Sequence, residues 1–130
     1  MRTNYKIMTT ENPNHLLESH PYLRQTINLI SDKWVVAVLY VLSFGTKRYS
    51  EIQKEIGNIS QRMLTRTLRD LERNGLVDRQ VYPAVPAMVE YSLTSLGISL
   101  SEVTKSLCNW SINNFQQVEV ARSDYDNADK

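Results

Sequence analysis

ISQRMLTRTLRDLERNG, residues 59–75, favours a single helix with two chemically different faces. At about 100° per residue, Leu64, Leu68 and Leu71 fall close together on one side of the helix. The opposite side carries four arginines, which are Arg62, Arg66, Arg69 and Arg73. One face therefore suits a hydrophobic core, and the other suits an anionic partner.

Both ends of this helix carry residues that favour a helix boundary. Ser60 is a good N-cap because its hydroxyl can accept a hydrogen bond from an early backbone N–H. Gly75 readily adopts the left-handed conformation that follows many helices. Two interpretations of the charged face are open from this stretch alone. It is either solvated, with support from an Arg66–Asp70 pair four residues apart, or it binds a partner.

The composition is that of one ordinary globular domain. Of the 130 residues, 42% are hydrophobic and 22% are charged, which is sufficient for one sizeable core. No apolar run approaches the roughly 20 residues of a membrane span, and the N-terminus lacks the basic and apolar regions of a secretory signal. We therefore expect a cytoplasmic protein without a membrane partner. The single cysteine, Cys108, excludes an internal disulfide and a cysteine metal cluster.

The net charge of +1 conceals an uneven distribution along the chain. Residues 47–79 carry eight Lys or Arg residues against five Asp or Glu residues, whereas residues 80–130 carry three against six. Positive charge is thus concentrated around the helix described above. This asymmetry is expected if one part of the protein faces phosphate groups.

Two helices are expected in the N-terminal third of the chain. Residues 1–19 are polar and lack periodicity, so we interpret them as a flexible arm. Apolar residues recur at helical spacing from Pro21 to Ser31, which predicts a short amphipathic helix. The segment KWVVAVLYVLSF, residues 33–44, is apolar on nearly every side and predicts a core helix capped by Ser31 or Asp32. Its β-branched residues would also suit a buried strand, and that alternative stays open.

A third helix is expected over residues 50–56, SEIQKEI, because Ser50 and Gln53 form a capping-box pattern. Gly57 and Asn58 end this helix, and only the turn GNI separates it from the arginine-bearing helix. Two helices joined by such a short turn, the second longer and polar on its outer face, are typical of a helix-turn-helix unit.

The period then changes from helical to alternating, which predicts two strands over residues 77–82 and 89–93. Between them lies PAVPA, in which Pro83 and Pro86 remove backbone donors and stiffen the chain. We expect a β-hairpin with a wide projecting loop rather than a tight turn. A hairpin directly after a recognition helix is a wing.

Thr94 can cap a last helix from Ser95 to Phe115. Its apolar residues recur at spacings of four and three and form a short heptad stripe, consisting of Leu96, Leu100, Val103, Leu107 and Trp110. We interpret this apolar stripe as a dimer interface, and the alternative is that it packs against its own domain. Residues 116–130 are interpreted as an acidic, frayed tail.

Two segments together resemble the HxlR-type family of bacterial winged helix-turn-helix transcriptional regulators, in the MarR-like winged-helix superfamily. They are LISDKWVVAVLYVL and RYSEIQKEIGNISQRMLTRTLRDLERNGLVDRQVYPAVPAMVEYSLTSLG, and the resemblance covers roughly Pro21 to Trp110. It implies a mainly α fold with a small β-hairpin (α+β) and flanking N- and C-terminal dimerisation helices. The implied organisation is an arm over 1–19, a winged helix-turn-helix domain over 20–115 whose helix at about 95–115 mediates dimerisation, and a tail over 116–130.

The resemblance implies a homodimer on a partly palindromic operator in double-stranded DNA, with the helix from Gln61 in the major groove. Arg suits guanine O6 and N7, and Gln suits adenine N6 and N7. We expect base contacts from the first half of the helix and phosphate contacts from its second half, while Met63 is either an apolar contact or part of the core. The candidate DNA-binding residues are Ser60, Gln61, Arg62, Met63, Thr65, Arg66, Arg69 and Arg73 on the helix, and Lys47, Arg48, Ser50, Arg79, Gln80, Tyr82 and Pro83 on the wing and flank.

Many family members that sense oxidants carry a cysteine just before the first core helix, where this chain has His20. That thiol is absent, so a sensor at this position is excluded. Cys108 is the one remaining candidate for a redox role. It either forms an intersubunit disulfide or has no redox role and packs as a half-buried apolar residue. His15 and His20 have no clustered Cys, Asp or Glu at ligand spacing, so we expect no metal site.

We expect a sequence-specific transcriptional regulator that needs no cofactor and is switched by a small molecule or a stress signal. An enzyme is disfavoured because the chain lacks a glycine-rich phosphate loop, a nucleophile elbow and metal-ligand spacing. The alternative is a winged-helix protein-interaction or architectural module without a specific operator. The four arginines favour DNA, because such a module would carry acidic or apolar residues on that face.

Overall fold

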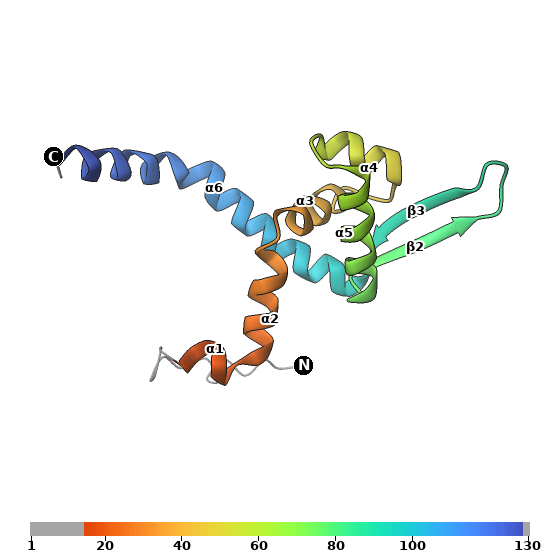
Figure 1. The fold of residues 1–130 in the computed structure, drawn as a ribbon, viewed down its shortest axis with the longest axis horizontal. Helices are drawn as coiled ribbons and strands as arrows, with labels where there is room; N and C mark the ends of the chain where they lie inside the picture. The colour runs from red at the N-terminus through yellow and green to blue at the C-terminus, as the bar shows by residue number, and fades with distance from the viewer. Residues whose placement is uncertain (1–14, 129–130) are drawn as a thin grey trace.

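The computed structural model describes residues 15–128, which form six helices and a small three-stranded sheet (Figure 1). In chain order the elements are α1 (Leu16–Ser19), α2 (Pro21–Ile30), α3 (Lys33–Leu42), β1 (Lys47–Arg48), α4 (Tyr49–Ile56), α5 (Gln61–Arg73), β2 (Val77–Tyr82), β3 (Met88–Leu93) and α6 (Ser95–Ala128). The expected class, mainly α with a small β-hairpin in a winged helix-turn-helix arrangement, is confirmed.

Helix α3 forms the centre of the core. Asp32 caps it by accepting a hydrogen bond from the backbone N–H of Trp34 at 2.9 Å. Val38 and Leu39 are fully buried, and α4, α5 and α6 all pack against this helix. The prediction of a core helix is therefore confirmed, with its end at Leu42 rather than residue 44, and the buried-strand alternative is wrong.

Helices α4 and α5 form the predicted helix-turn-helix unit. Helix α4 begins at Tyr49, and its N-cap is Arg48 rather than Ser50, because β1 already holds Arg48 in an extended conformation. The backbone N–H of Arg48 donates to the Glu51 carboxylate at 2.7 Å, so the predicted capping box starting at Ser50 is wrong by two residues. Gly57 follows α4 with φ of 95°, a conformation that a side chain would strain.

The sheet has the strand order β1-β3-β2, and both neighbouring pairs are antiparallel. Strands β2 and β3 are the predicted hairpin, paired from Val77 opposite Leu93 to Tyr82 opposite Met88. The sequence predicts two strands and the structure adds a third, β1, because a two-residue strand is too short to show a periodicity. Figure 1 shows this hairpin projecting from the helices as a wing.

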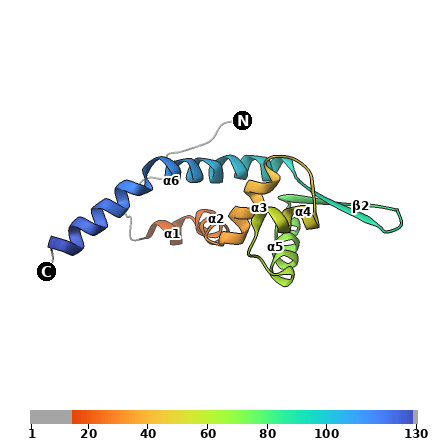
Figure 2. The ribbon, with the colours of Figure 1, turned by 90° about the horizontal axis from the view of Figure 1, so that it is seen from above.

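Helix α6 follows the wing and is the longest element of the fold. The Thr94 hydroxyl accepts from the backbone N–H of Gly97 at 3.0 Å, so the predicted cap is confirmed. The helix continues to Ala128, and the expected end at Phe115 with a frayed tail is wrong for residues 116–128. No Gly or Pro follows Gly97 in the sequence, so nothing local stops the helix. Figures 1 and 2 both show its C-terminal half extending away from the other helices.

The N-terminal part differs from the expected arm. Residues 1–14 lie outside the described residues, as do residues 129–130 of the expected tail. Residues 16–19 form the short helix α1, where Nδ1 of His15 lies 3.0 Å from Oε1 of Glu18. Helix α2 has Pro21 as its first residue, as predicted.

Candidate nucleic-acid interface

Helix α5 is held at its start by a cap and along one side by the core. Oγ of Ser60 accepts a hydrogen bond from the backbone N–H of Met63 at 3.1 Å, which confirms the predicted N-cap. Leu64, Leu68 and Leu71 are at most 1% exposed. Burial of this leucine face forces the opposite side of the helix to face solvent.

The exposed side of α5 is the arginine face defined by Arg62, Arg66, Arg69 and Arg73. These side chains line an open groove of about 780 Å³, together with Gln61, Thr65 and Asp70. Within residues 15–128, no carboxylate lies within 4.0 Å of any of the four guanidinium groups, so the Arg66–Asp70 pair considered from the sequence is not formed. Four uncompensated positive charges on one face are suited to a polyanion.

Thr65 and Met63 are partly buried, unlike side chains that are fully available to contact bases. Oγ1 of Thr65 is 2.9 Å from the hydroxyl of Tyr49, a residue of α4, and this contact is partly buried. Met63 is partly buried and packs against the core, which favours the core interpretation of this residue over the apolar contact. Gln61, Arg62 and Arg66 remain exposed in the first half of the helix.

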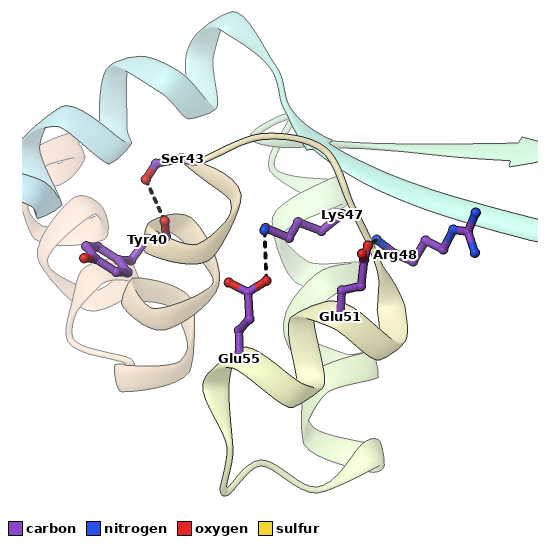
Figure 3. Close-up of polar contacts among 6 residues, drawn as sticks. All are labelled: Tyr40, Ser43, Lys47, Arg48, Glu51 and Glu55. Atoms are coloured by element: carbon purple, nitrogen blue, oxygen red, sulfur yellow. Dashed lines mark hydrogen bonds and ion pairs between the residues drawn. The ribbon is translucent and has the colours of Figure 1, made fainter.

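Lys47 does not carry a free positive charge toward the arginine face. Its Nζ lies 2.8 Å from Oε2 of Glu55, and its side chain is only 22% exposed (Figure 3). The expectation that Lys47 contributes to the DNA-binding footprint is therefore not supported by this geometry, because its charge is compensated within the domain. Arg48, the next residue, is exposed, and Figure 3 shows its guanidinium directed away from the Lys47–Glu55 pair. Ser50 is also exposed.

The wing places its two central polar residues on opposite faces. Arg79 lies opposite Tyr91 in the β2–β3 ladder, and the next pair is Gln80 opposite Glu90. Because side chains alternate along a strand, Arg79 faces α5 and Gln80 faces the other way. A polar cavity of about 320 Å³ between helix and wing is lined by Thr65, Leu68, Arg69, Glu72, Arg79 and Tyr91.

Tyr82 and Pro83, at the outer end of β2, are exposed, so they remain available for contact with a partner. Two residues of the interface are missed by reading the sequence. In the sequence pattern, Tyr49 has the spacing of an apolar residue in a short helix. Tyr91 has the spacing of an apolar residue in a strand. Neither pattern indicates a contact with α5, because the partners come from a different element.

Four of the five residues of the apolar stripe on α6 lie outside the side that packs on its own domain, and the fifth, Leu100, packs against the core. Gly97, Ser101 and Thr104 are buried, and they lie roughly 100° around the helix from the stripe. Leu100 is half-buried, and the other four members of the stripe are 50% to 59% exposed: Leu96, Val103, Leu107 and Trp110. Cys108 is half-buried and has a free thiol.

A metal ion and a membrane are two further possible partners of residues 15–128. This part of the chain holds no group of three or more His, Cys, Asp or Glu side chains placed to bind a metal ion. None of its helices is both long enough and apolar enough to cross a membrane. The arginine face and its flanks are therefore the feature of the described residues whose chemistry points most directly to a partner.

Comparison with known proteins is consistent with this geometry. The model of the HxlR-like helix-turn-helix family matches residues 29–119. An HTH-type transcriptional regulator of Methanothermobacter thermautotrophicus is 51% identical over 84 residues, covering 65% of this chain and 64% of that protein, less than two thirds of its length. The HTH-type transcriptional regulator YkvN of Bacillus subtilis is 46% identical over 101 residues, covering 78% of this chain and 85% of that protein. The solved structure of the transcriptional regulator ytfH from Salmonella typhimurium has a TM-score of 0.71 and 37% identity, covering 77% of this chain and 89% of that one.

Proposed function

The chain belongs to the HxlR-like helix-turn-helix family and is a winged-helix transcriptional regulator rather than an enzyme, and from this premise we propose that it acts as a homodimer on a partly palindromic operator in double-stranded DNA. The observation that carries the proposal is the arginine face of α5, which has no carboxylate within 4.0 Å of its guanidinium groups among the described residues. A DNA backbone supplies the missing negative charge.

The proposed readout divides α5 into two halves. Gln61, Arg62 and Arg66 lie near the N-terminal end, where a recognition helix enters the major groove, and they contact base edges. Arg69 and Arg73 lie further along and contact phosphates. Phosphate contacts position the protein, while the base contacts distinguish one sequence from another.

The wing supplies a second set of contacts. Arg79 faces α5 across the polar cavity beside Arg69, so the two guanidinium groups can hold the same DNA strand. Arg48 extends the positive surface on the flank. Tyr82 and Pro83, near the end of β2, reach the backbone or the minor groove.

The dimer forms through the apolar stripe of α6, with Leu107 and Trp110 at its C-terminal end. The support is that four of its five residues are about half exposed in one chain, although the fifth, Leu100, packs against the core. The buried residues Gly97, Ser101 and Thr104 lie on a different side of the helix. An isologous pairing of two such helices would place the two α5 helices in successive major grooves, about 34 Å apart. A signal that changes this spacing changes the affinity for the operator.

The proposed signal is a small molecule or a stress signal that acts without a cysteine at position 20, where this chain has a histidine. The protein works in the cytoplasm on chromosomal DNA. Cys108 lies about 100° around the helix from Leu107, on the side of Gly97, Ser101 and Thr104, and we assign it a packing role because it is half-buried.

Recovery of genomic DNA fragments by the purified protein at two salt concentrations tests the proposal. Binding to phosphates weakens steeply with salt whatever the sequence, so the higher concentration enriches sites that are also read through their bases. Recovery of one partly palindromic sequence is the expected result. Salt-sensitive binding without a preferred sequence would contradict it and favour an architectural module.

A further inference from the structure

The hydroxyl of Tyr49 joins the first residue of α4 to the first turn of α5. It donates a hydrogen bond to the backbone carbonyl of Gln61 at 2.8 Å and lies 2.9 Å from Oγ1 of Thr65. Gln61 is the first residue of α5, and Thr65 stands one turn later on the same side of the helix. Tyr49 thus adds a contact from α4 to the end of the recognition helix that Ser60 caps and that enters the groove.

The donors and acceptors of this cluster have a definite order. A tyrosine hydroxyl has one proton, and here that proton is donated to the carbonyl of Gln61. The contact with Thr65 is therefore a hydrogen bond that the threonine hydroxyl donates to the oxygen of Tyr49. The hydroxyl proton of Thr65 is donated inside the protein, so that side chain cannot donate a hydrogen bond to a base at the same time.

The packing of the two helices explains why this link matters. Helices α4 and α5 both pack on α3, and their direct contacts with each other are sparse. The ring of Tyr49 is partly buried and packs against the hydrophobic core, which fixes the position of its hydroxyl. One further polar link supports the turn, a hydrogen bond of 3.4 Å from Nε2 of Gln53 to the carbonyl of Ile59. Among the described residues, Tyr49 is thus the side chain of α4 that hydrogen-bonds directly to α5.

We propose that Tyr49 is a positioning residue for operator recognition, which fixes the first turn of α5 and holds the Thr65 hydroxyl away from the bases. Sequence discrimination then comes from Gln61, Arg62 and Arg66, and Thr65 contributes through its bond to Tyr49. This inference rests on the proposed function, because it assigns how the same DNA-binding surface is oriented.

The substitution Tyr49→Phe tests the inference because it removes the hydroxyl and keeps the ring that packs on the core. We expect affinity for the preferred operator to fall about three- to ten-fold, the range of one or two net hydrogen bonds. Affinity for DNA without that sequence, and the salt dependence of binding, should stay unchanged because no phosphate contact is lost. Tyr22→Phe is the matched control, since Tyr22 is 84% exposed on α2. Equal loss on both DNAs, or no loss at all, would overturn the positioning role.

A double-mutant cycle with Thr65→Val separates positioning from direct base contact. If Thr65 acts through Tyr49, the double variant should lose no more operator affinity than the larger of the two single losses. The contrary result has two parts: the losses add, and Thr65→Val changes the preference at one base pair when it is added to Tyr49→Phe. It would show that Thr65 contacts a base independently. That result would overturn the inference.

Amide hydrogen exchange of the free protein provides a measurement that needs no operator. Tyr49→Phe should raise exchange in the first two turns of α5 and leave α3 and α6 unchanged, because only the first turn loses its link. Unchanged exchange at these amides would refute the positioning of α5. Failure of the wild-type protein to select any sequence would refute the proposed function instead, so the two failures are distinguishable.

Discussion

Gly97, in the first turn of α6, lies directly against the backbone carbonyl of Leu76. A Cβ atom at position 97 would stand 2.0 Å from that oxygen, which is far inside van der Waals contact. The same carbonyl accepts a hydrogen bond from the backbone N–H of Thr94 at 3.0 Å, and the Thr94 hydroxyl donates to the carbonyl of Gly75 at 2.7 Å. The start of the proposed dimer helix is therefore bound to the segment that links the recognition helix to the wing.

Gly97→Ala should lower the free energy of unfolding. Alanine is favoured over glycine inside a helix by about 1 kcal/mol, but forcing a methyl group into a closed site costs about 1–3 kcal/mol. We expect the steric cost to prevail because the nearest atom is backbone, which cannot rotate away. Urea denaturation would measure the change, with the exposed Ser106→Ala as a control on α6. Equal or greater stability of Gly97→Ala would contradict the close approach.

Lys47→Met and Arg48→Met should separate a structural charge from a DNA-binding one. Lys47 is paired with Glu55 in the domain (Figure 3), so its loss should cost at most about 1 kcal/mol of stability and leave the salt dependence of DNA binding unchanged. Loss of Arg48 should lower the slope of log affinity against log salt by about one. Titrations at several salt concentrations would test both. A reduced slope for Lys47→Met would show that Lys47 contributes to the DNA-binding footprint after all.

Arg66→Ala should weaken binding to the preferred operator by about 1–3 kcal/mol, the usual value of a bidentate contact between arginine and guanine. The loss should be concentrated at one base pair, so operator variants at that position should bind the variant protein with nearly equal affinity. Arg24→Ala is a suitable control because Arg24 is exposed on α2 and is not among the residues that line the groove of the arginine face. Unchanged operator affinity for Arg66→Ala at fixed salt would count against the proposed readout.

Trp110→Glu should convert the proposed dimer to a monomer. A carboxylate buried in an apolar interface loses its hydration without gaining a partner, which costs several kcal/mol. The wild-type protein should show twice the 15.0 kDa chain mass at micromolar concentration in sedimentation or light scattering. Asn109→Glu, on the side of α6 away from the stripe, should leave that mass unchanged. A monomeric wild-type protein would refute the dimer.

Periodicity along one segment was sufficient to predict α2, α5 and the wing, whereas α3 was predicted from a continuous apolar run that left a buried strand open. The leucines and arginines of α5 predict both its helix and its two faces, because each face is defined by residues three or four apart. Caps such as Asp32, Ser60 and Thr94 could also be predicted, since a cap depends on a few consecutive residues. These features are local, and local physics determines them.

The sequence was misleading about the start of α4 and about the end of α6. Strand β1 exists because Lys47 and Arg48 pair with Tyr91 and Glu90 of the wing, and this pairing moves the start of α4 to Tyr49. The end of α6 was misjudged because acidic composition was interpreted as fraying, although no residue there stops a helix. The first error arises because a strand from another segment sets the start of α4. The second arises because acidic residues alone do not end a helix.

The helix-turn-helix unit, the wing and the concentration of arginines on one face can all be predicted from residue spacing within single segments. Tertiary packing then settles which side chains have partners inside the protein. It pairs Lys47 with Glu55, joins Thr65 to Tyr49 and closes Gly97 on Leu76. Each of these contacts joins residues from two different segments, and their approach depends on how the elements pack around α3 rather than on any periodic pattern.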